Sequence, residues 1–193
     1  MYVRGAKKRE EVWLLDRLEE LGIDDPAFRS RDYVVALDEE TGEKAGFGRL
    51  RVHTAEDDSE VCELTAIGTL AEWREQGVGA HVVERLVEMA RDKGFDELYA
   101  CTQNGGYLTQ FGFEPIPESE LPEPLGERLA AVRERDPEAV PLRLDTDAFT
   151  MPPRHRERFK AADTGEETEE VQETPEDFGI DPDEATYKYD TGG

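Results

Sequence analysis

The residues with the clearest chemical pattern form one run, Arg74-Glu-Gln-Gly-Val-Gly-Ala-His81, between a strand pattern and a long amphipathic helix pattern. Glycines at 77 and 79 can adopt backbone conformations closed to other residues, and they let the backbone approach a ligand closely. The first turn of the following helix has unpaired N–H groups, and the helix dipole adds partial positive charge there. The run therefore predicts a seat for a pyrophosphate, with Arg74 adding a charge-assisted hydrogen bond.

Two familiar phosphate-binding motifs do not fit this run. A P-loop requires Gly-Lys-Ser/Thr, whereas Gly79 is followed by Ala80 and His81. A dinucleotide fingerprint requires a third Gly or Ala where Val82 stands. A glycine-rich strand-to-helix turn without a ligand remains as the structural alternative.

The run also satisfies Arg/Gln-x-x-Gly-x-Gly/Ala, the acetyl-CoA signature of the GNAT N-acetyltransferases, through Arg74, Gly77 and Gly79. The stretch from Thr69 to Gly79 resembles the family's Val-x-Pro-x-Tyr-Arg-Gly-x-Gly-x-Gly. It departs at Ala71, where Pro is usual, and at Glu75, where Gly is common. Tyr107-Leu-Thr-Gln-Phe-Gly-Phe113 is similar to the family's Tyr-Phe-x-x-x-Gly-Phe. The resemblance covers residues 2–149 and implies the GNAT fold.

The resemblance implies acetyl-CoA as cosubstrate and places its contacts. Pantetheine would pair with the backbone of Ile67 and Thr69 as an extra strand does. Asn104 would help to position cofactor or substrate, or would only begin a helix. The pyrophosphate would be held by the loop and helix start, which comprise Arg74, Glu75, Gln76, Gly77, Val78, Gly79 and Ala80.

Two residues are candidates for proton transfer. Glu63 lies on the strand before the loop, where several GNAT enzymes carry a glutamate base, and burial would raise its pKa toward a useful value. The alternative is a Glu63 that faces solvent. Tyr107 is the candidate acid, although many members of the family place the tyrosine one residue later, where Leu108 stands. The alternative for Tyr107 is packing against the sheet, and His53 and His81 are interpreted as bystanders.

The function implied is transfer of an acetyl group from acetyl-CoA to a primary amine of a small molecule or amino acid. A Leu-Pro segment near residue 121 resembles acetyltransferases that include amino-acid N-acetyltransferases of the glutamate type. The arginines Arg29, Arg31, Arg49 and Arg51 would bind a substrate carboxylate or pair with surface acids. The alternatives are a protein N-acetyltransferase and a non-catalytic acyl-CoA-binding module with a partner-docking tail.

The hydrophobic pattern predicts a mixed central sheet flanked by helices, an α/β or α+β sandwich. Strands are expected at 2–4, 32–37, 45–53, 60–69, 97–102 and 140–149, with a short one after 115. Helices are expected at 7–21, 78–93, 105–111 and 125–134. In the first helix, Val12, Leu15, Leu18 and Leu21 are expected to form the buried face.

The composition restricts the partners and the setting. The formal net charge of −24 opposes nucleic-acid binding and is typical of proteins from a high-salt cytoplasm, or of disorder. Apolar periodicity up to residue 150 favours the folded, halophilic interpretation there. Cys62 and Cys101 are expected to be buried thiols, and no metal site is expected. No stretch is apolar enough to span a membrane, so a cytoplasmic protein without a membrane partner is expected, with a homodimer left open.

The chain is expected to divide into a catalytic domain, residues 1–150, and an acidic, disordered tail, residues 151–193. Residues 163–193 contain 12 acidic residues against one basic residue, Lys188, and few aliphatic ones. Such a segment cannot bury enough apolar surface to offset its ordering entropy. The apolar residues Phe178, Ile180, Tyr187 and Tyr189 are spaced like the anchors of a short docking peptide, which leaves a protein partner open.

Overall fold

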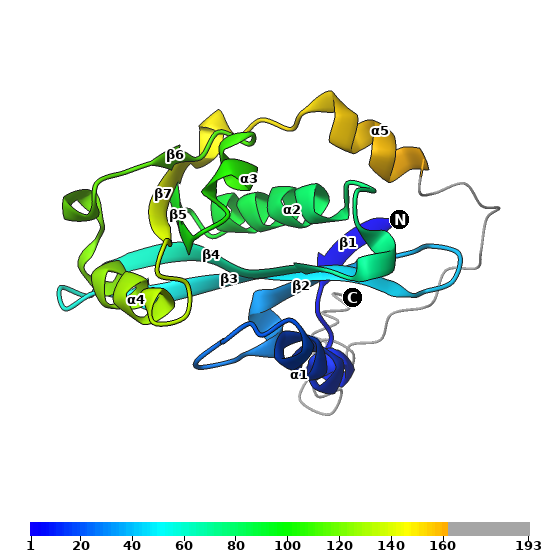
Figure 1. The fold of residues 1–193 in the computed structure, drawn as a ribbon, viewed down its shortest axis with the longest axis horizontal. Coiled ribbons are helices and arrows are strands. Elements are labelled where there is room, and N and C mark those ends of the chain that lie inside the picture. Colours follow the sequence, from blue (N-terminus) through cyan, green and yellow to red (C-terminus); the bar gives the residue numbers. More distant parts are fainter. Residues whose placement is uncertain (162–193) are drawn as a thin grey trace, which may run out of the picture.

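The computed structural model describes residues 1–161, and the expectations for residues 163–193 lie outside this part of the chain. A seven-stranded sheet has the order β1-β2-β3-β4-β5-β7-β6. Strands β4 and β5 run parallel, and the other neighbours are antiparallel. The mixed sheet flanked by helices confirms the expected α/β architecture (Figure 1). The strands are β1 (Tyr2–Gly5), β2 (Tyr33–Leu37), β3 (Lys44–Thr54), β4 (Glu60–Thr69), β5 (Glu97–Thr102), β6 (Glu114–Pro115) and β7 (Val140–Asp145).

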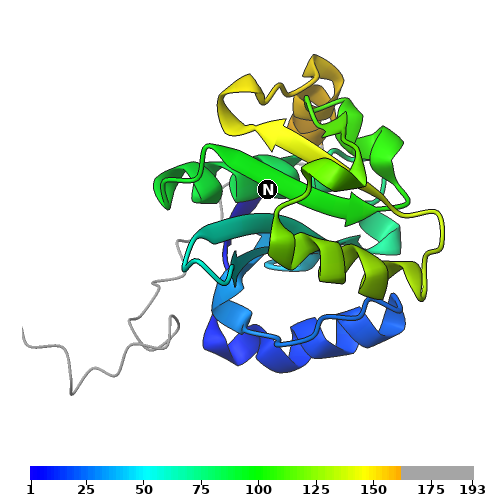
Figure 2. The same cartoon turned by 90° about the vertical axis from the view of Figure 1, so that its left-hand side faces the viewer.

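Helices cover both faces of the sheet (Figures 1 and 2). On one face lies α2, whose buried stripe of Val82, Val83, Leu86, Val87 and Ala90 joins the larger apolar core. The opposite face carries α1, with α4 beside it. The helices are α1 (Glu11–Glu20), α2 (Val78–Asp92), α3 (Gly105–Thr109), α4 (Glu123–Arg133) and α5 (Pro153–Ala161).

The buried face of α1 differs from the expected one. Leu14 and Leu18 are buried, whereas Val12 is 70% exposed and Leu15 45% exposed. The helix begins only at Glu11, and an i, i+4 pair lies on one face of a helix with 3.6 residues per turn. The expected three-residue spacing drifts away from that face, so the expectation was wrong for all of its members except Leu18.

Strand β4 bends and then separates from β5. Between the pairs Phe47–Gly68 and Arg49–Thr65, β4 contains one residue more than β3, and Ala66 has φ of +51°. Such a bulge increases strand twist and is common beside active sites. Strands β4 and β5 pair at Glu63–Tyr99. Beyond that pair, Leu64 to Thr69 and Ala100 to Asn104 form opposite walls of a cavity.

Helix α5 lies within the segment expected to be a disordered tail. It packs on the N-terminal half of α2, with its Phe159 ring stacked on His81 at a centroid distance of 3.7 Å. Ordered structure therefore extends beyond residue 150, the boundary expected from composition. No helix within residues 1–161 is long and apolar enough to cross a membrane.

Candidate active site

The glycine-rich loop enters α2 through left-handed backbone. Gly77 precedes the helix with φ of +78°, and Glu75 has φ of +62°. A Cβ added to Gly77 would lie 2.4 Å from the carbonyl oxygen of His155, and one added to Gly79 would lie 2.8 Å from the Tyr107 hydroxyl. Glycine is thus required at position 77 by both close backbone approach and conformation, whereas a side chain at position 79 would displace the Tyr107 hydroxyl.

A cavity of about 280 Å³ lies at this loop. Arg74 is exposed beside it, and within residues 1–161 its guanidinium has no hydrogen-bond or ion-pair partner. Unpaired N–H groups of the first turn of α2, together with this cation, fit a diphosphate. The cavity is lined by Thr69, Trp73, Arg74, Glu75, Gly77, Val78, Gly79, Tyr107, His155 and Arg158.

The residues expected to bind cofactor divide into three groups. Thr69, Arg74, Glu75, Gly77, Val78 and Gly79 line the smaller cavity, whereas Ile67 and Asn104 line the larger one, together with Thr69, Arg74 and Gly79. Two side chains face neither cavity. The Gln76 amide donates to the backbone oxygen of Glu72, and Ala80 is buried in the core. Ala80 can therefore take part in ligand binding only through its backbone, and the Gln76 amide is turned toward Glu72.

The larger cavity, about 770 Å³, occupies the wedge between β4 and β5. Its outer wall comes from two segments distant in sequence, Leu21 to Asp24 after α1 and the end of α4 with Arg128, Ala131, Val132, Arg135 and Asp136. Figure 2 shows α4 beside α1 on this side of the sheet. Arg135 and Asp24 form an ion pair of 3.8 Å between the two segments, so side chains partly close the cavity.

Tyr107 lines both cavities, at the point where they meet beside Gly79. Burial raises the pKa of its phenol to about 12, so the hydroxyl keeps its proton at neutral pH. Leu108, which stands where many family members have tyrosine, is only 3% exposed and belongs to the core. Tyr107 therefore lines both cavities, whereas Leu108 lines only the larger one and has no group that can donate a proton.

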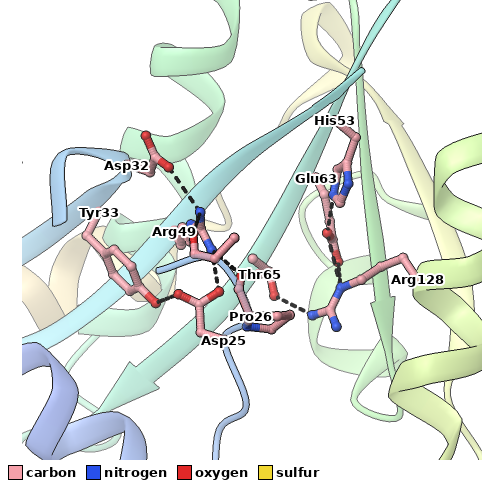
Figure 3. Close-up of polar contacts among 10 residues, drawn as sticks. Asp25, Pro26, Asp32, Tyr33, Arg49, His53, Glu63, Thr65 and Arg128 are labelled. Carbon is pink, nitrogen blue, oxygen red and sulfur yellow. Dashed lines mark hydrogen bonds and ion pairs between the residues drawn. The ribbon is translucent and has the colours of Figure 1, made fainter. Parts of the chain in front are cut away.

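Glu63 lies on β4 and is 1% exposed, so the solvent-facing alternative was wrong. His53 Nε2 lies 2.7 Å from its Oε2, and Arg128 Nε donates to its Oε1 at 3.0 Å (Figure 3). Arg128 Nη2 also donates to the Thr65 hydroxyl at 3.3 Å. Arg128 lines the larger cavity, and Glu63 does not. The carboxylate is therefore separated from the cavity by the arginine that it binds.

The four arginines expected on the substrate side have different environments. Arg49 is 2% exposed and is paired with Asp25 and Asp32 (Figure 3). The expectation that it binds a substrate carboxylate was therefore wrong, and the alternative of pairing with acidic side chains holds. Arg29 and Arg31 are exposed, and neither lines a cavity described above. Arg51 lies opposite Glu63 on β3, and burial lowers the pKa of its guanidinium, partly offset by Glu63.

Three residues were missed as members of the site. His53 was interpreted as a bystander, yet it shares the buried Glu63 with Arg128. His81, also interpreted so, bonds the Gly77 carbonyl through Nδ1 at 2.9 Å. Alternation along β3 places His53 on the same face as Arg51, which is a signal that sequence reasoning had available. Arg128 carries no such signal, because only the packing of α4 brings it to β4.

The described residues contain no group of three His, Cys, Asp or Glu side chains arranged to hold a metal ion. Cys62 and Cys101 are both free thiols, and Cys62 is buried.

Known proteins resemble this chain in sequence and fold. The family model described as the acetyltransferase (GNAT) family matches residues 5–113. An uncharacterized N-acetyltransferase of Chlorobaculum tepidum is 24% identical over 121 residues, which are 63% of this chain and 69% of that protein. Among solved structures, N-acetylglutamate synthase of Neisseria gonorrhoeae, complexed with coenzyme A and N-acetyl-glutamate, has a TM-score of 0.58 and 22% identity.

That match covers 74% of this chain but only 34% of the synthase, so this chain spans about one third of its length. Rv2747 of Mycobacterium tuberculosis, in complex with CoA and NLQ, has a TM-score of 0.57 and 18% identity. The match covers 75% of this chain and 99% of that one. At these identities the two structures establish a common fold.

Proposed function

Because the chain belongs to the GNAT acetyltransferase family, we propose that it transfers the acetyl group of acetyl-CoA to the primary amine of a small molecule that carries a carboxylate, such as an amino acid. Acetyl-CoA supplies the activated thioester. The observation that carries the choice of acceptor is Arg128, a cation fixed at the wall of the larger cavity.

Asp24 and Asp136 also line this cavity, but around Glu63 the guanidiniums outnumber the carboxylate, which favours an anionic acceptor there. Glu63 is a single buried carboxylate, and it lies beside two guanidiniums, those of Arg128 and Arg51. Arg128 uses Nε for Glu63 and Nη2 for Thr65, which leaves its Nη1 donors for a ligand. A guanidinium held in this way matches a carboxylate well, because less side-chain freedom is lost on binding.

The size of the cavity supports a small acceptor over a peptide. The segment Leu21 to Asp24 and the end of α4 close its outer side, and the Arg135–Asp24 pair joins them. A protein N-terminus or lysine would have to enter beside this exposed pair. The alternative of a protein acceptor is therefore tested by the same experiment as the amino-acid one, by adding peptides to the panel.

Tyr107 is the proposed acid. Its hydroxyl lies beside Gly79, where the loop meets the wedge, and its raised pKa keeps it protonated until a thiolate forms. Glu63 remains the proposed base. Both of its oxygens are bonded to His53 or Arg128, so an amine proton would reach the Glu63–His53 pair through water.

The acidic composition fits a protein that functions at high salt, and we propose that this protein does so. The chain has a net charge of −24, and repulsion among its carboxylates is weaker when the Debye length falls to about 3 Å at 1 M salt. The measurement is the unfolding temperature between 0.1 and 3 M KCl, which should rise with salt. An unfolding temperature that falls with KCl would contradict the halophilic setting and leave the enzymatic proposal untouched.

The function is tested by thiol release from acetyl-CoA at molar KCl, across a panel of amino acids, simple amines and peptides. Release that depends on an amino acid, and that falls when the amino acid is replaced by its decarboxylated amine, would support the proposal. Equal rates with the decarboxylated amines would overturn the carboxylate-bearing acceptor. Coenzyme A binding without turnover on any acceptor would favour a non-catalytic acyl-CoA-binding module.

A further inference from the structure

Helix α5 brings a cluster of positive charge to the glycine-rich loop. Its nine residues include four Arg or Lys side chains and one Glu, in a chain with 47 acidic and 23 basic residues. Two of its members, His155 and Arg158, line the same 280 Å³ cavity as Arg74 and Gly77. This composition is opposite to that of the rest of the chain, and it occurs where the loop offers its backbone N–H groups.

Contacts with α2 and α3 fix the position of α5. Phe159 stacks on His81 with an interplanar angle of 8°, and Arg156 pairs with Glu84 of α2 at 2.6 Å. His155 Nε2 lies 2.7 Å from the Gln110 side-chain oxygen, just after α3. The backbone of α5 also approaches the loop so closely that only glycine fits at position 77. The helix is therefore a wall of the loop cavity.

Arg158 is free to bind a ligand there. Within the described part of the chain, its guanidinium has no hydrogen-bond or ion-pair partner, and the same holds for Arg74. The other α5 arginines are engaged, Arg154 with Gln110 and Arg156 with Glu84. Two guanidiniums from segments far apart in the sequence thus line one cavity without a carboxylate partner in residues 1–161. This is unexpected in a protein in which carboxylates outnumber cations.

We infer that Arg158 of α5 binds the diphosphate of coenzyme A from the side opposite the glycine-rich loop, as a second cation beside Arg74. The diphosphate is the group concerned, because Arg158 shares its cavity with Gly77, Val78 and Gly79, whose backbone forms the diphosphate seat. A guanidinium that adds charge-assisted hydrogen bonds to a phosphate strengthens binding without adding to the acyl-transfer chemistry. The inference rests on the proposed function, since it takes coenzyme A as the occupant of the loop cavity.

The test is calorimetric titration of the full chain with three probes: coenzyme A, dephospho-coenzyme A and pantetheine. Dephospho-coenzyme A keeps the diphosphate and lacks the 3′-phosphate, and pantetheine has neither. Arg158→Gln should raise the Kd of the first two by a similar factor, roughly fivefold for a partly exposed charge pair, and leave that of pantetheine unchanged. The matched control is Lys160→Gln, which removes one charge from the same helix at a residue that does not line the cavity.

Three results would overturn the inference. A loss confined to coenzyme A would assign Arg158 to the 3′-phosphate instead. An equal loss in Lys160→Gln would show that only the net charge of α5 acts, and no loss in Arg158→Gln would show no contact. Arg158 is exposed, so its substitution should not unfold α5. Circular dichroism checks that the helical content of the variant is unchanged. If the wild-type chain binds no coenzyme A at all, the proposed function itself fails, and this result is distinct from the other three.

Discussion

Arg128→Met should destabilise the protein because it leaves Glu63 as a buried carboxylate without its cation. Glu63 is 1% exposed and Arg128 Nε lies 3.0 Å from it. Removing one partner of a buried ion pair costs roughly 3–5 kcal/mol, and the remaining bond to His53 at 2.7 Å places the value near the lower end, about 3 kcal/mol. For a chain of this size that is a fall in Tm of about 6–12 °C.

The double variant Glu63→Gln/Arg128→Met should recover most of the loss, because the amide of glutamine carries no charge and can still bond His53. Denaturant unfolding of wild type, both single variants and the double variant at one fixed KCl concentration gives the coupling energy, for which we expect about 2 kcal/mol. The control is Arg85→Met on α2, whose partner Glu88 is 50% exposed, so that the pair should contribute about 1 kcal/mol or less.

The reasoning would be refuted if Arg128→Met lost less than about 1 kcal/mol, or if the coupling energy were near zero. Either result would mean that Arg128 does not offset the cost of burying the Glu63 carboxylate. The same variant tests, in activity assays, whether Arg128 acts on the acceptor or on acetyl-CoA. We expect the KM for an amino-acid acceptor to rise more than the KM for acetyl-CoA, since Arg128 does not line the loop cavity proposed for the diphosphate.

The loop and α5 yield three further predictions. Glu75→Gly should tighten coenzyme A binding several-fold in titration calorimetry, because it removes a carboxylate from the loop cavity, and it should raise Tm, because Glu75 holds left-handed backbone, which costs about 1–2 kcal/mol; unchanged or weaker binding would contradict the first expectation. Gly77→Ala should weaken coenzyme A binding at least tenfold and lower Tm, since its Cβ would lie 2.4 Å from the His155 oxygen, and an unchanged Kd would show that α5 moves away freely. Burial lowers the pKa of His81 and of His155, so these groups take up protons more readily when α5 is undocked; their contribution to docking is present above the ordinary pKa of 6.5 and is lost as pH falls below it. Hydrogen exchange of α5 amides, corrected for intrinsic rates, should therefore show less protection at pH 5.5 than at pH 7.5, and His81→Asn should reduce the difference; equal protection at both pH values would count against it.

The sequence alone determined those features that depend on neighbouring residues. The order of strands and helices follows from local periodicity, and α2 lies at Val78–Asp92, close to the expected 78–93. The glycine spacing indicated the loop before α2, and Gly77 does hold the left-handed conformation that a turn into a helix of this kind requires. Even the departure at Glu75 has a local meaning, since a residue there must also adopt positive φ.

Only the tertiary structure decided which distant groups meet. Helix propensity does not fix the rotation of α1, which is set by the packing of Leu14 and Leu18 on the sheet. The burial of Arg49 with Asp25 and Asp32, and the meeting of Glu63, His53 and Arg128, join segments that no local rule relates. Composition also assigned residues 151–161 to the acidic tail, although α5 is itself basic and docks on α2 through Phe159. The physical reason is the same in each case: burial and charge pairing between distant segments are free energies of the folded chain as a whole, and periodicity along the sequence does not contain them.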